Sequence, residues 1–399
     1  MMAKARALQV FVKRLLPLLK KVGLPGEPAA LGIACLAASG SEHRQKISWA
    51  AMEKSPYIVK DLTECFRDLG LGYPGTETVE ARVDDAAVAK VVRAFWGAPA
   101  DDPAWYRGVL AGLAAAPGGA PPAVADLMVR LAEPKGRVFV PFCCSGGLLA
   151  ALTAAPGISL TWSAEGDDPD FCALVLRAAA TLSSFKVEGP VLIDKAQGPF
   201  SFICADVLPK GAGKKLLTSK VLERLLSLLD SDGVFLALVS PDVVSGRSFA
   251  GLRRDLVEKG HLDAVMRVPK EQFTNVRAGG YILIVRPDRQ KEKPVLFADL
   301  GGIEEVTDKK MGPELSAVVA AYRDFVEWEI NEEQPYLHLA SRDEMNSKGH
   351  DLDILLYVTP PEEKIDLREE YDRLYRLERE RKELEERMDG LLAEMSGRW

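Results

Sequence analysis

No apolar run in the 399 residues is long enough to cross a bilayer, so the sequence predicts no membrane-spanning helix. Cysteine is scarce, and the six thiols form no C-x-x-C pair and no metal-like spacing with histidine. Adjacent Cys143 and Cys144 invite a metal or redox interpretation, but reduced thiols packed near a turn are favoured. The composition predicts a cytoplasmic protein of about two or three domains, without a metal site.

Acidic residues are absent from the first 26 positions, which carry six basic residues. Apolar residues recur there at helical spacing from Leu8 to Val22. A basic amphipathic helix can lie on a membrane or a nucleic acid, or serve as a transit peptide. The favoured interpretation is the opening helix of a helical domain. Lys13 and Arg14 interrupt the apolar stretch, which argues against a cleaved secretory signal.

The rest of the chain has no basic excess, because the net charge is −7 despite this N-terminal segment. Residues 362–399 hold thirteen acidic and nine basic residues, and the middle of the chain is acidic as well. Strong, self-sufficient DNA binding needs clustered Lys and Arg, so the charge argues against it. A subunit that reaches DNA through a partner stays compatible, and no target-recognition module is evident.

The chain divides into three parts by pattern. Residues 1–117 are rich in alanine and leucine, with apolar positions three and four apart, which predicts a helical domain. A proline- and glycine-rich loop ends it. Across 118–361, short apolar strands alternate with helices, which predicts a mostly parallel sheet covered on both faces. The leucines and methionines of 362–399 favour a coiled-coil-like, partner-binding helix over a solvated charge run.

Polar residues follow several of the expected strands, where an open α/β sheet binds its ligands. The strands are expected at 138–140, 160–164, 191–193, 200–205, 234–239, 264–268 and 281–285, with an added edge strand at 295–298. The loops after Val140, Ala164, Ile193 and Ala205 are therefore predicted to carry the site.

The first strand runs straight into a turn of small residues, V-F-V-P-F-C-C-S-G-G at 138–147. Such a turn lets a ligand approach the backbone and opens a helix whose amides can face an anion. Any tight strand-to-helix turn favours glycine, so this motif alone favours a structural role. Glu165 follows the second strand, where an acid can accept hydrogen bonds from both ribose hydroxyls of a nucleoside cofactor. A solvated acid is the alternative.

These segments resemble the N6-adenine DNA methyltransferases, in particular the modification subunits of type I restriction–modification systems. The family loop reads D-P-x-C-G-S-G-G; here Val140 and Cys144 replace the acid and the first glycine. W-S-A-E-G-D-D-P at 162–169 resembles the family's G-x-E-x-x-P. The resemblance implies S-adenosylmethionine as the cofactor. The cofactor-binding residues that it implies are Pro141, Cys143, Ser145, Gly146, Glu165 and Asp194.

The fourth strand corresponds to the family's catalytic segment, F-D-x-I-I-A-N-P-P-F. This chain reads F-S-F-I-C-A-D-V-L-P at 200–209. In the family, the Asn side chain and the next Pro carbonyl accept hydrogen bonds from the adenine amino group, and the aromatic residue stacks on the flipped base. Asp206 can still accept such a bond and is the predicted catalytic residue. Losing a base–aromatic stack costs about 1–3 kcal/mol.

The resemblance extends on both sides of the site. Residues 118–121 align with the family's G-E-F-Y-T-P, which closes over the methionine end of the cofactor, but they lack its acid and aromatics. Residues 234–287 follow the family's order of helix, strand, V-P, loop and strand, and 331–358 resemble the segment that closes its catalytic domain. A basic loop with Lys210, Lys214 and Lys215 either holds a DNA phosphate or is solvated.

The resemblance implies a Rossmann-like, S-adenosylmethionine-dependent methyltransferase fold with a helical N-terminal domain and a long C-terminal helix. Three functions stay open. The first is a diverged, weakly active or inactive scaffold subunit of a DNA complex. The second is an active DNA adenine N6-methyltransferase that needs a separate specificity subunit. The third is a methyltransferase for small molecules or proteins. DNA, and a specificity-type subunit bound by the C-terminal helix, are the implied partners, within a homo- or hetero-oligomer.

Overall fold

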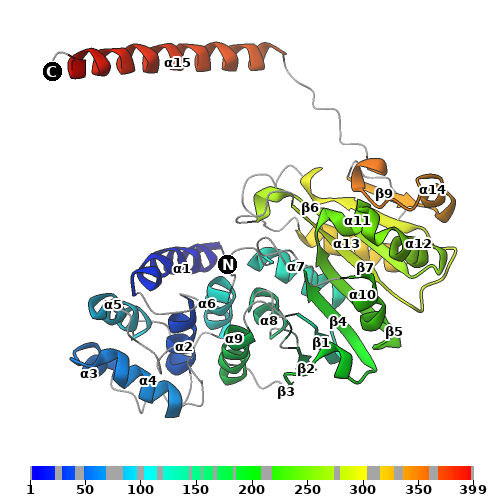
Figure 1. The fold of residues 1–399 in the computed structure, drawn as a ribbon, viewed down its shortest axis with the longest axis horizontal. Coiled ribbons are helices and arrows are strands. Elements are labelled where there is room, and N and C mark those ends of the chain that lie inside the picture. The colour runs from blue at the N-terminus through cyan, green and yellow to red at the C-terminus, as the bar shows by residue number, and fades with distance from the viewer. Residues whose placement is uncertain are drawn as a thin grey trace. The chain divides into compact units, whose positions relative to one another are not determined.

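A computed structural model gives the fold of the chain (Figure 1). The residues that it describes are 2–22, 29–40, 49–68, 84–96, 103–114, 120–142, 146–153, 155, 157–163, 165, 169–182, 186–207, 218–273, 279–302, 315–327, 336–358 and 367–396. The chain forms two compact units, Met1–Thr359 and Pro360–Trp399. A separate domain boundary at residue 117 stays a prediction.

The N-terminal part is helical, as the composition predicts. Its helices are α1 (Met2–Val22), α2 (Ala29–Gly40), α3 (Trp49–Glu53), α4 (Ile58–Asp68), α5 (Asp85–Trp96) and α6 (Pro103–Ala114). The apolar side of α1 packs against α2, α5 and α6, and Phe11 meets Phe95 edge-on at 5.7 Å between ring centroids. The amphipathic first segment is therefore the opening helix of a helical part.

A sheet of nine strands follows in the order β3-β2-β1-β4-β5-β7-β6-β8-β9. The strands are β1 (Gly136–Val140), β2 (Ile158–Trp162), β3 (Lys186–Glu188), β4 (Phe200–Asp206), β5 (Leu229–Val239), β6 (Leu262–Val268), β7 (Gly280–Val285), β8 (Val295–Asp299) and β9 (Leu337–Ala340). β7 runs antiparallel to β5 and β6, and β9 runs antiparallel to β8, whereas the other pairs are parallel. The prediction of a mostly parallel sheet is confirmed.

Helices cover both faces of this sheet, because strand residues alternate between two apolar cores. Val138 and Val140 belong to one core and Phe139 to the other. The first core is covered by α7 (Pro122–Ala132), α8 (Gly146–Leu152), α9 (Pro169–Leu182) and α13 (Leu315–Val326). The second is covered by α10 (Ser219–Leu226), α11 (Pro241–Ser245), α12 (Ala250–Glu258) and α14 (Arg342–Ser347). α2 and α6 pack on α8 and α9, so the helical part shares the first core.

The predicted third strand is wrong. Lys186–Glu188 pair with β2, whereas residues 191–193 lead into a 3-10 turn, η2 (Ile193–Lys195). Pro190 precedes this run and has no N–H to donate to a ladder, so the apolar residues after it do not continue the strand. Asp194 consequently lies in a turn and does not end a strand.

The predicted edge strand is also corrected. β8 forms where expected, but β9 pairs outside it, with Leu296 opposite Leu339. All five residues of β8 are buried, which an internal strand requires and an edge strand does not. The C-terminal residues 336–358 thus close the sheet, in line with the resemblance of that segment.

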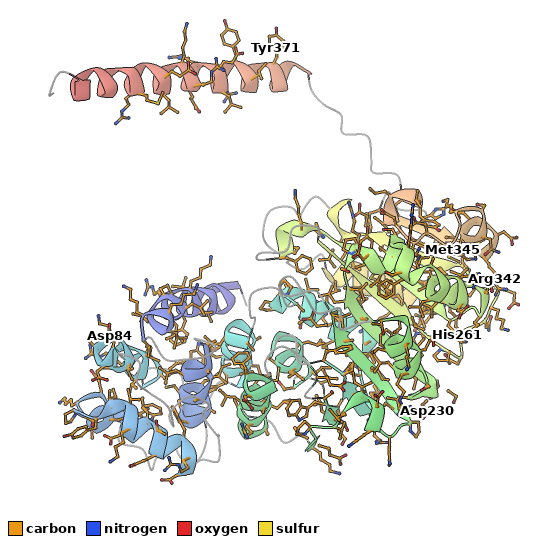
Figure 2. All side chains as sticks on the ribbon, in the orientation of Figure 1. Asp84, Asp230, His261, Arg342, Met345 and Tyr371 are labelled. Carbon is orange, nitrogen blue, oxygen red and sulfur yellow. The ribbon has the colours of Figure 1, made fainter. Side chains whose placement is uncertain are left out.

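The second unit contains α15 (Leu367–Ser396), which forms where the tail helix is predicted. Apolar side chains along it are exposed; Tyr371, labelled in Figure 2, is 69% exposed. No described helix is both long enough and apolar enough to cross a bilayer. Within the ranges given above, no three potential metal ligands come together.

Candidate functional site

The ends of β1 and β2 place two predicted cofactor loops side by side. Val140 lies opposite Trp162, and the Ser163 N–H donates to the Val140 carbonyl at 3.0 Å. Pro141 is buried directly after β1, and α8 begins at Gly146. Both loops leave the same edge of the sheet because the strands are parallel. Cys143 and Ser145, two further predicted cofactor residues, lie outside the described residues.

Glu165 is half-buried and holds the second and third loops together. Its Oε2 accepts the Ile193 N–H at 3.2 Å and lies 3.4 Å from the Ser163 hydroxyl, which donates to it. The same hydroxyl accepts the Glu165 N–H at 3.1 Å. No described residue hydrogen-bonds to Oε1 of Glu165. One carboxylate oxygen of Glu165 therefore links the second and third loops, and the other has no hydrogen-bond partner among the described residues.

Asp194 follows Ile193 and is exposed, so the Glu165 contact brings the two predicted acids into one corner. Arg224 from α10 supports this turn by donating to the carbonyls of Asp194 at 3.4 Å and Ala196 at 2.9 Å. Motif reading missed Arg224, because it lies on a helix that carries no family signature.

A glycine also shapes this corner, and sequence reasoning missed it. Gly189 has a φ of 117°, a conformation that L side chains rarely adopt. A Cβ at that position would lie 2.8 Å from the Trp162 carbonyl oxygen. That carbonyl accepts the Val191 N–H at 2.9 Å, so the turn passes close against the end of β2. The Gly-Pro pair at 189–190 was the available signal.

Asp206 ends β4 at the same edge, but its carboxylate binds the protein's own backbone. The side chain is 1% exposed, and Oδ2 accepts the Ala120 N–H at 2.6 Å. Ala120 belongs to the 118–121 segment that aligns with the family's cofactor-closing motif. The predicted catalytic acceptor thus anchors the approach to α7, through a contact between residues 86 positions apart.

Val207 takes the position of the family's first proline, and its backbone remains in the sheet. Its N–H donates to the Leu238 carbonyl at 2.9 Å, and the side chain is 8% exposed. A proline has no N–H and could not make this bond. The β4–β5 pairing therefore continues one residue past Asp206. Leu208, Pro209 and the basic loop with Lys210, Lys214 and Lys215 lie outside the described residues.

Further along the same edge, Arg267 of β6 makes a two-pronged ion pair with Asp299 of β8. The Nε–Oδ1 and Nη2–Oδ2 distances are 2.8 and 2.6 Å, and the hydrogen bond raises the pKa of Arg267. Nearby, the Tyr281 hydroxyl donates to Asp353 at 3.1 Å. Burial, followed by the charge of Asp353, raises the pKa of Tyr281. The Tyr281–Asp353 bond joins the closing segment to the sheet, whereas the Arg267–Asp299 pair joins two of its strands.

Residues 224–366 match the model of the N-6 DNA Methylase family, which covers the second half of the sheet and the closing segment. Over these residues, about a third of its length, the chain is similar to that family. The matched region holds Arg267, Asp299 and Tyr281, whereas Glu165 and Asp206 precede it.

Curated proteins with similar sequences are methylase subunits of type I restriction enzymes. The MjaVII subunit of Methanocaldococcus jannaschii is 28% identical over 155 residues, which are 35% of this chain and 26% of that protein. The MpnII subunit of Mycoplasma pneumoniae is 26% identical over 188 residues, 45% of this chain and 33% of that protein. The matches thus span about a quarter to a third of these relatives' lengths.

Solved structures confirm the methyltransferase fold. A type I restriction–modification methyltransferase subunit from Streptococcus thermophilus superposes with a TM-score of 0.61 at 14% identity, covering 89% of this chain and 99% of that one. A modification subunit of a type I restriction enzyme from Vibrio vulnificus gives 0.54 at 12% identity, covering 88% and 96%. At such identities, the likeness concerns the fold alone.

Proposed function

We propose that this chain is a diverged DNA adenine N6-methyltransferase-family subunit of a restriction–modification-like system. It acts as a scaffold within a DNA complex and has weak or no catalytic activity. The observation that carries this proposal is the Asp206–Ala120 hydrogen bond, which uses the predicted catalytic acceptor to hold the chain's own backbone. The chain resides in the cytoplasm in this proposal.

The cofactor half of the site fits a nucleoside. Glu165 presents one carboxylate oxygen beside the ends of β1 and β2, where an acid binds ribose hydroxyls. Asp194 stands in the adjoining turn, where it would meet the adenine ring. The loop from Pro141 to Gly146 would contact the methionine portion. S-adenosylmethionine, when bound, supplies an activated methyl group, and these residues orient it.

The base half fits less well. An adenine amino group would have to reach a side chain that is 1% exposed and whose Oδ2 already accepts the Ala120 N–H. Val207 keeps a backbone carbonyl but lacks the rigid proline turn that positions the second acceptor in the family, and no aromatic residue stands at 209. An acceptor misplaced by about 1 Å costs on the order of a hundredfold in rate. These differences support weak or absent catalysis.

The alternative is an active DNA adenine N6-methyltransferase that needs a specificity subunit. It is favoured by the position of Asp206, which ends β4 at the edge that also holds Glu165. A methyltransferase for small molecules or proteins would share the cofactor half but would need a different acceptor-binding half.

The C-terminal helix is the proposed docking site for a specificity-type subunit. Its apolar residues recur three and four apart, and the described ones are 55–69% exposed at Tyr371, Leu374, Leu377, Leu384 and Met388. Arg381 interrupts this seam. A stripe of this kind is typical of a helix that buries one side against a partner helix. DNA is then reached through the assembled complex.

Calorimetric titration with S-adenosylmethionine tests the cofactor half. We expect binding by the wild type and its loss in Glu165→Ala, whereas Asp170→Ala, an exposed acid at the start of α9, binds normally. Glu165→Gln keeps an oxygen acceptor for the Ile193 N–H, and separates ligand binding from support of the turn. If the wild type did not bind S-adenosylmethionine at millimolar concentration, the cofactor half of the proposal would be wrong and the chain would be a scaffold that binds no cofactor.

Methyl transfer to adenine-containing duplex DNA tests the base half. We expect no incorporation above background, or incorporation that Asp206→Ala leaves unchanged. Robust methylation that disappears in Asp206→Ala would refute the scaffold proposal and establish the active alternative.

A further inference from the structure

The exposed face of α1 carries positive charge that the cofactor site does not explain. We propose that this face binds the phosphate backbone of duplex DNA. The inference rests on the proposed function in one respect, namely that the chain works in a DNA complex. The surface is defined by Lys13, Arg14, Lys20 and Lys21, all of which are exposed.

Packing fixes the direction of this face. The residues of α1 that point inward are Val12, Leu15, Leu19 and Val22, which are at most 8% exposed. With 3.6 residues per turn, they lie on the side of the helix opposite the four cations. Because α2, α5 and α6 cover the apolar side, the helix cannot insert that side into a membrane. The four cations instead face outward from a helix that is held in place by its packing against α2, α5 and α6.

Charge of a single sign separates α1 from its neighbours. Its 21 residues include no acid, and none of the four cations forms an ion pair with a described residue. α4, in the same helical part, mixes its charges: Lys60 lies 4.0 Å from Glu64 at i,i+4. Although the chain has a net charge of −7, the cations of α1 have no acids beside them on the helix, so the positive electrostatic potential is concentrated on this face.

A structural explanation accounts for only part of this pattern. Lys20 and Lys21 lie in the last turn, where cations favour the negative end of the helix dipole. Asp84, labelled in Figure 2, donates its N–H to the Val22 carbonyl and brings an acid to that end. Lys13 and Arg14 lie in the middle of the helix, where neither effect operates.

The spacing suits a polyanion of high linear charge. The two cation pairs are seven residues apart, or about 10.5 Å along the helix axis. Duplex DNA carries one charge per ~1.7 Å, so this length faces about six phosphates. A membrane surface would attract the same cations mainly through headgroup charge, since Val10, which is 41% exposed, and Pro17 are the exposed apolar residues among the described side chains of α1.

The test is binding of the full chain to a fluorescent 30-base-pair duplex between 50 and 200 mM salt. The altered protein is Arg14→Gln/Lys20→Gln/Lys21→Gln. The matched control is Arg67→Gln/Lys54→Gln/Lys60→Gln, which also removes one Arg and two Lys from exposed positions of the helical part. Thermal melting of each variant establishes that the fold is intact.

We expect the wild type to bind, and the α1 variant to bind more weakly with a shallower salt dependence. Three lost phosphate contacts reduce the slope of log K against log salt by about 2.7. Across this fourfold salt range, the wild-type affinity should therefore fall about fortyfold more than that of the α1 variant. The control should follow the wild type.

Equal affinity and slope in the α1 variant and the wild type would overturn the proposal, as would absence of wild-type binding at 50 mM salt. Wild-type binding to phosphatidylserine vesicles without binding to DNA would overturn it in favour of a membrane surface. Calorimetry with S-adenosylmethionine on the α1 variant keeps the two proposals apart, because its cofactor binding should equal that of the wild type whether or not α1 meets DNA.

Discussion

Replacing Asp206 should reveal whether this carboxylate serves structure or chemistry. In Asp206→Ala, the Ala120 N–H loses a charged acceptor at 2.6 Å in a site where the side chain is 1% exposed. Hydrogen bonds to charged groups contribute about 1.5–3 kcal/mol, and a buried donor left without a partner costs about 1–3 kcal/mol. We expect the free energy of unfolding to fall by about 2–3 kcal/mol.

The corresponding change in melting temperature is small but measurable. An unfolding entropy of about 2.1 cal/mol/K per residue gives roughly 0.75 kcal/mol/K for the unit Met1–Thr359. The expected decrease in Tm is therefore about 3–4 °C. Differential scanning calorimetry at neutral pH, with all variants at one protein concentration, provides the measurement.

Two controls isolate the hydrogen bond. Asp206→Asn keeps an oxygen that can accept the Ala120 N–H, so it should lose only about half as much stability. Asp232→Ala removes an exposed carboxylate from the neighbouring strand β5 and should stay within about 0.5 kcal/mol of the wild type.

The sign of the effect decides between the two roles. A carboxylate kept for catalysis is commonly a stability cost, so its removal would raise the melting temperature. An Asp206→Ala protein as stable as the wild type, or more stable, would refute the structural role and revive the case for an active enzyme. Equal losses in Asp206→Ala and Asp206→Asn would show that the negative charge matters, and not the oxygen acceptor alone.

Three further predictions concern other ionisable groups. Burial raises the pKa of Glu344, but hydrogen bonds from Lys348 and His338 outweigh it and hold that pKa below its usual value. Ionised Glu344 therefore contributes its full stabilisation above the ordinary pKa of ~4.3, and this contribution is lost as the pH falls through the pKa of Glu344 in the folded protein. Urea-unfolding curves of the wild type and Glu344→Gln should converge at that low pH. Burial, followed by the charge of Asp68, raises the pKa of Cys65 to about 11. Its alkylation at pH 8 should thus be about a hundredfold or more slower than that of a free thiol in mass spectrometry; equal rates would contradict this. Arg253, 5% exposed, donates to four backbone carbonyls, so Arg253→Ala should cost at least about 2–3 kcal/mol in urea unfolding, and an unchanged midpoint would refute its role.

Local pattern was sufficient for most of the elements. Apolar runs alternating with helical periods predicted β1, β2, β4 and the helices between them, because burial on both faces of a parallel sheet demands continuous apolar strands. The prediction of the third strand failed because Pro190 interrupts the ladder just before a run that reads as apolar. β9 was missed because its neighbour β8 looked like an edge, and strand neighbours are chosen by long-range pairing.

The candidate site shows the same division. Glu165 was found from its position after a strand, roughly twenty residues beyond a glycine turn, because strand order and direction place such an acid at the ligand edge. Its bond to the Ile193 N–H, and the support that Arg224 gives to the same turn, link segments with no common motif. The sequence pattern therefore identified Glu165, but it could not show which oxygen of the Glu165 carboxylate binds the protein's own backbone.

By itself, the sequence determined the fold class, the family likeness and the replacement of the catalytic tetrad, since these depend on residue type and on periods of two and 3.6. Only the tertiary structure decided what Asp206 does and where the charge of α1 faces. The first depends on an amide 86 residues away, and the second on which side of an amphipathic helix its neighbours cover. Both are set by packing between distant segments, which no local pattern encodes.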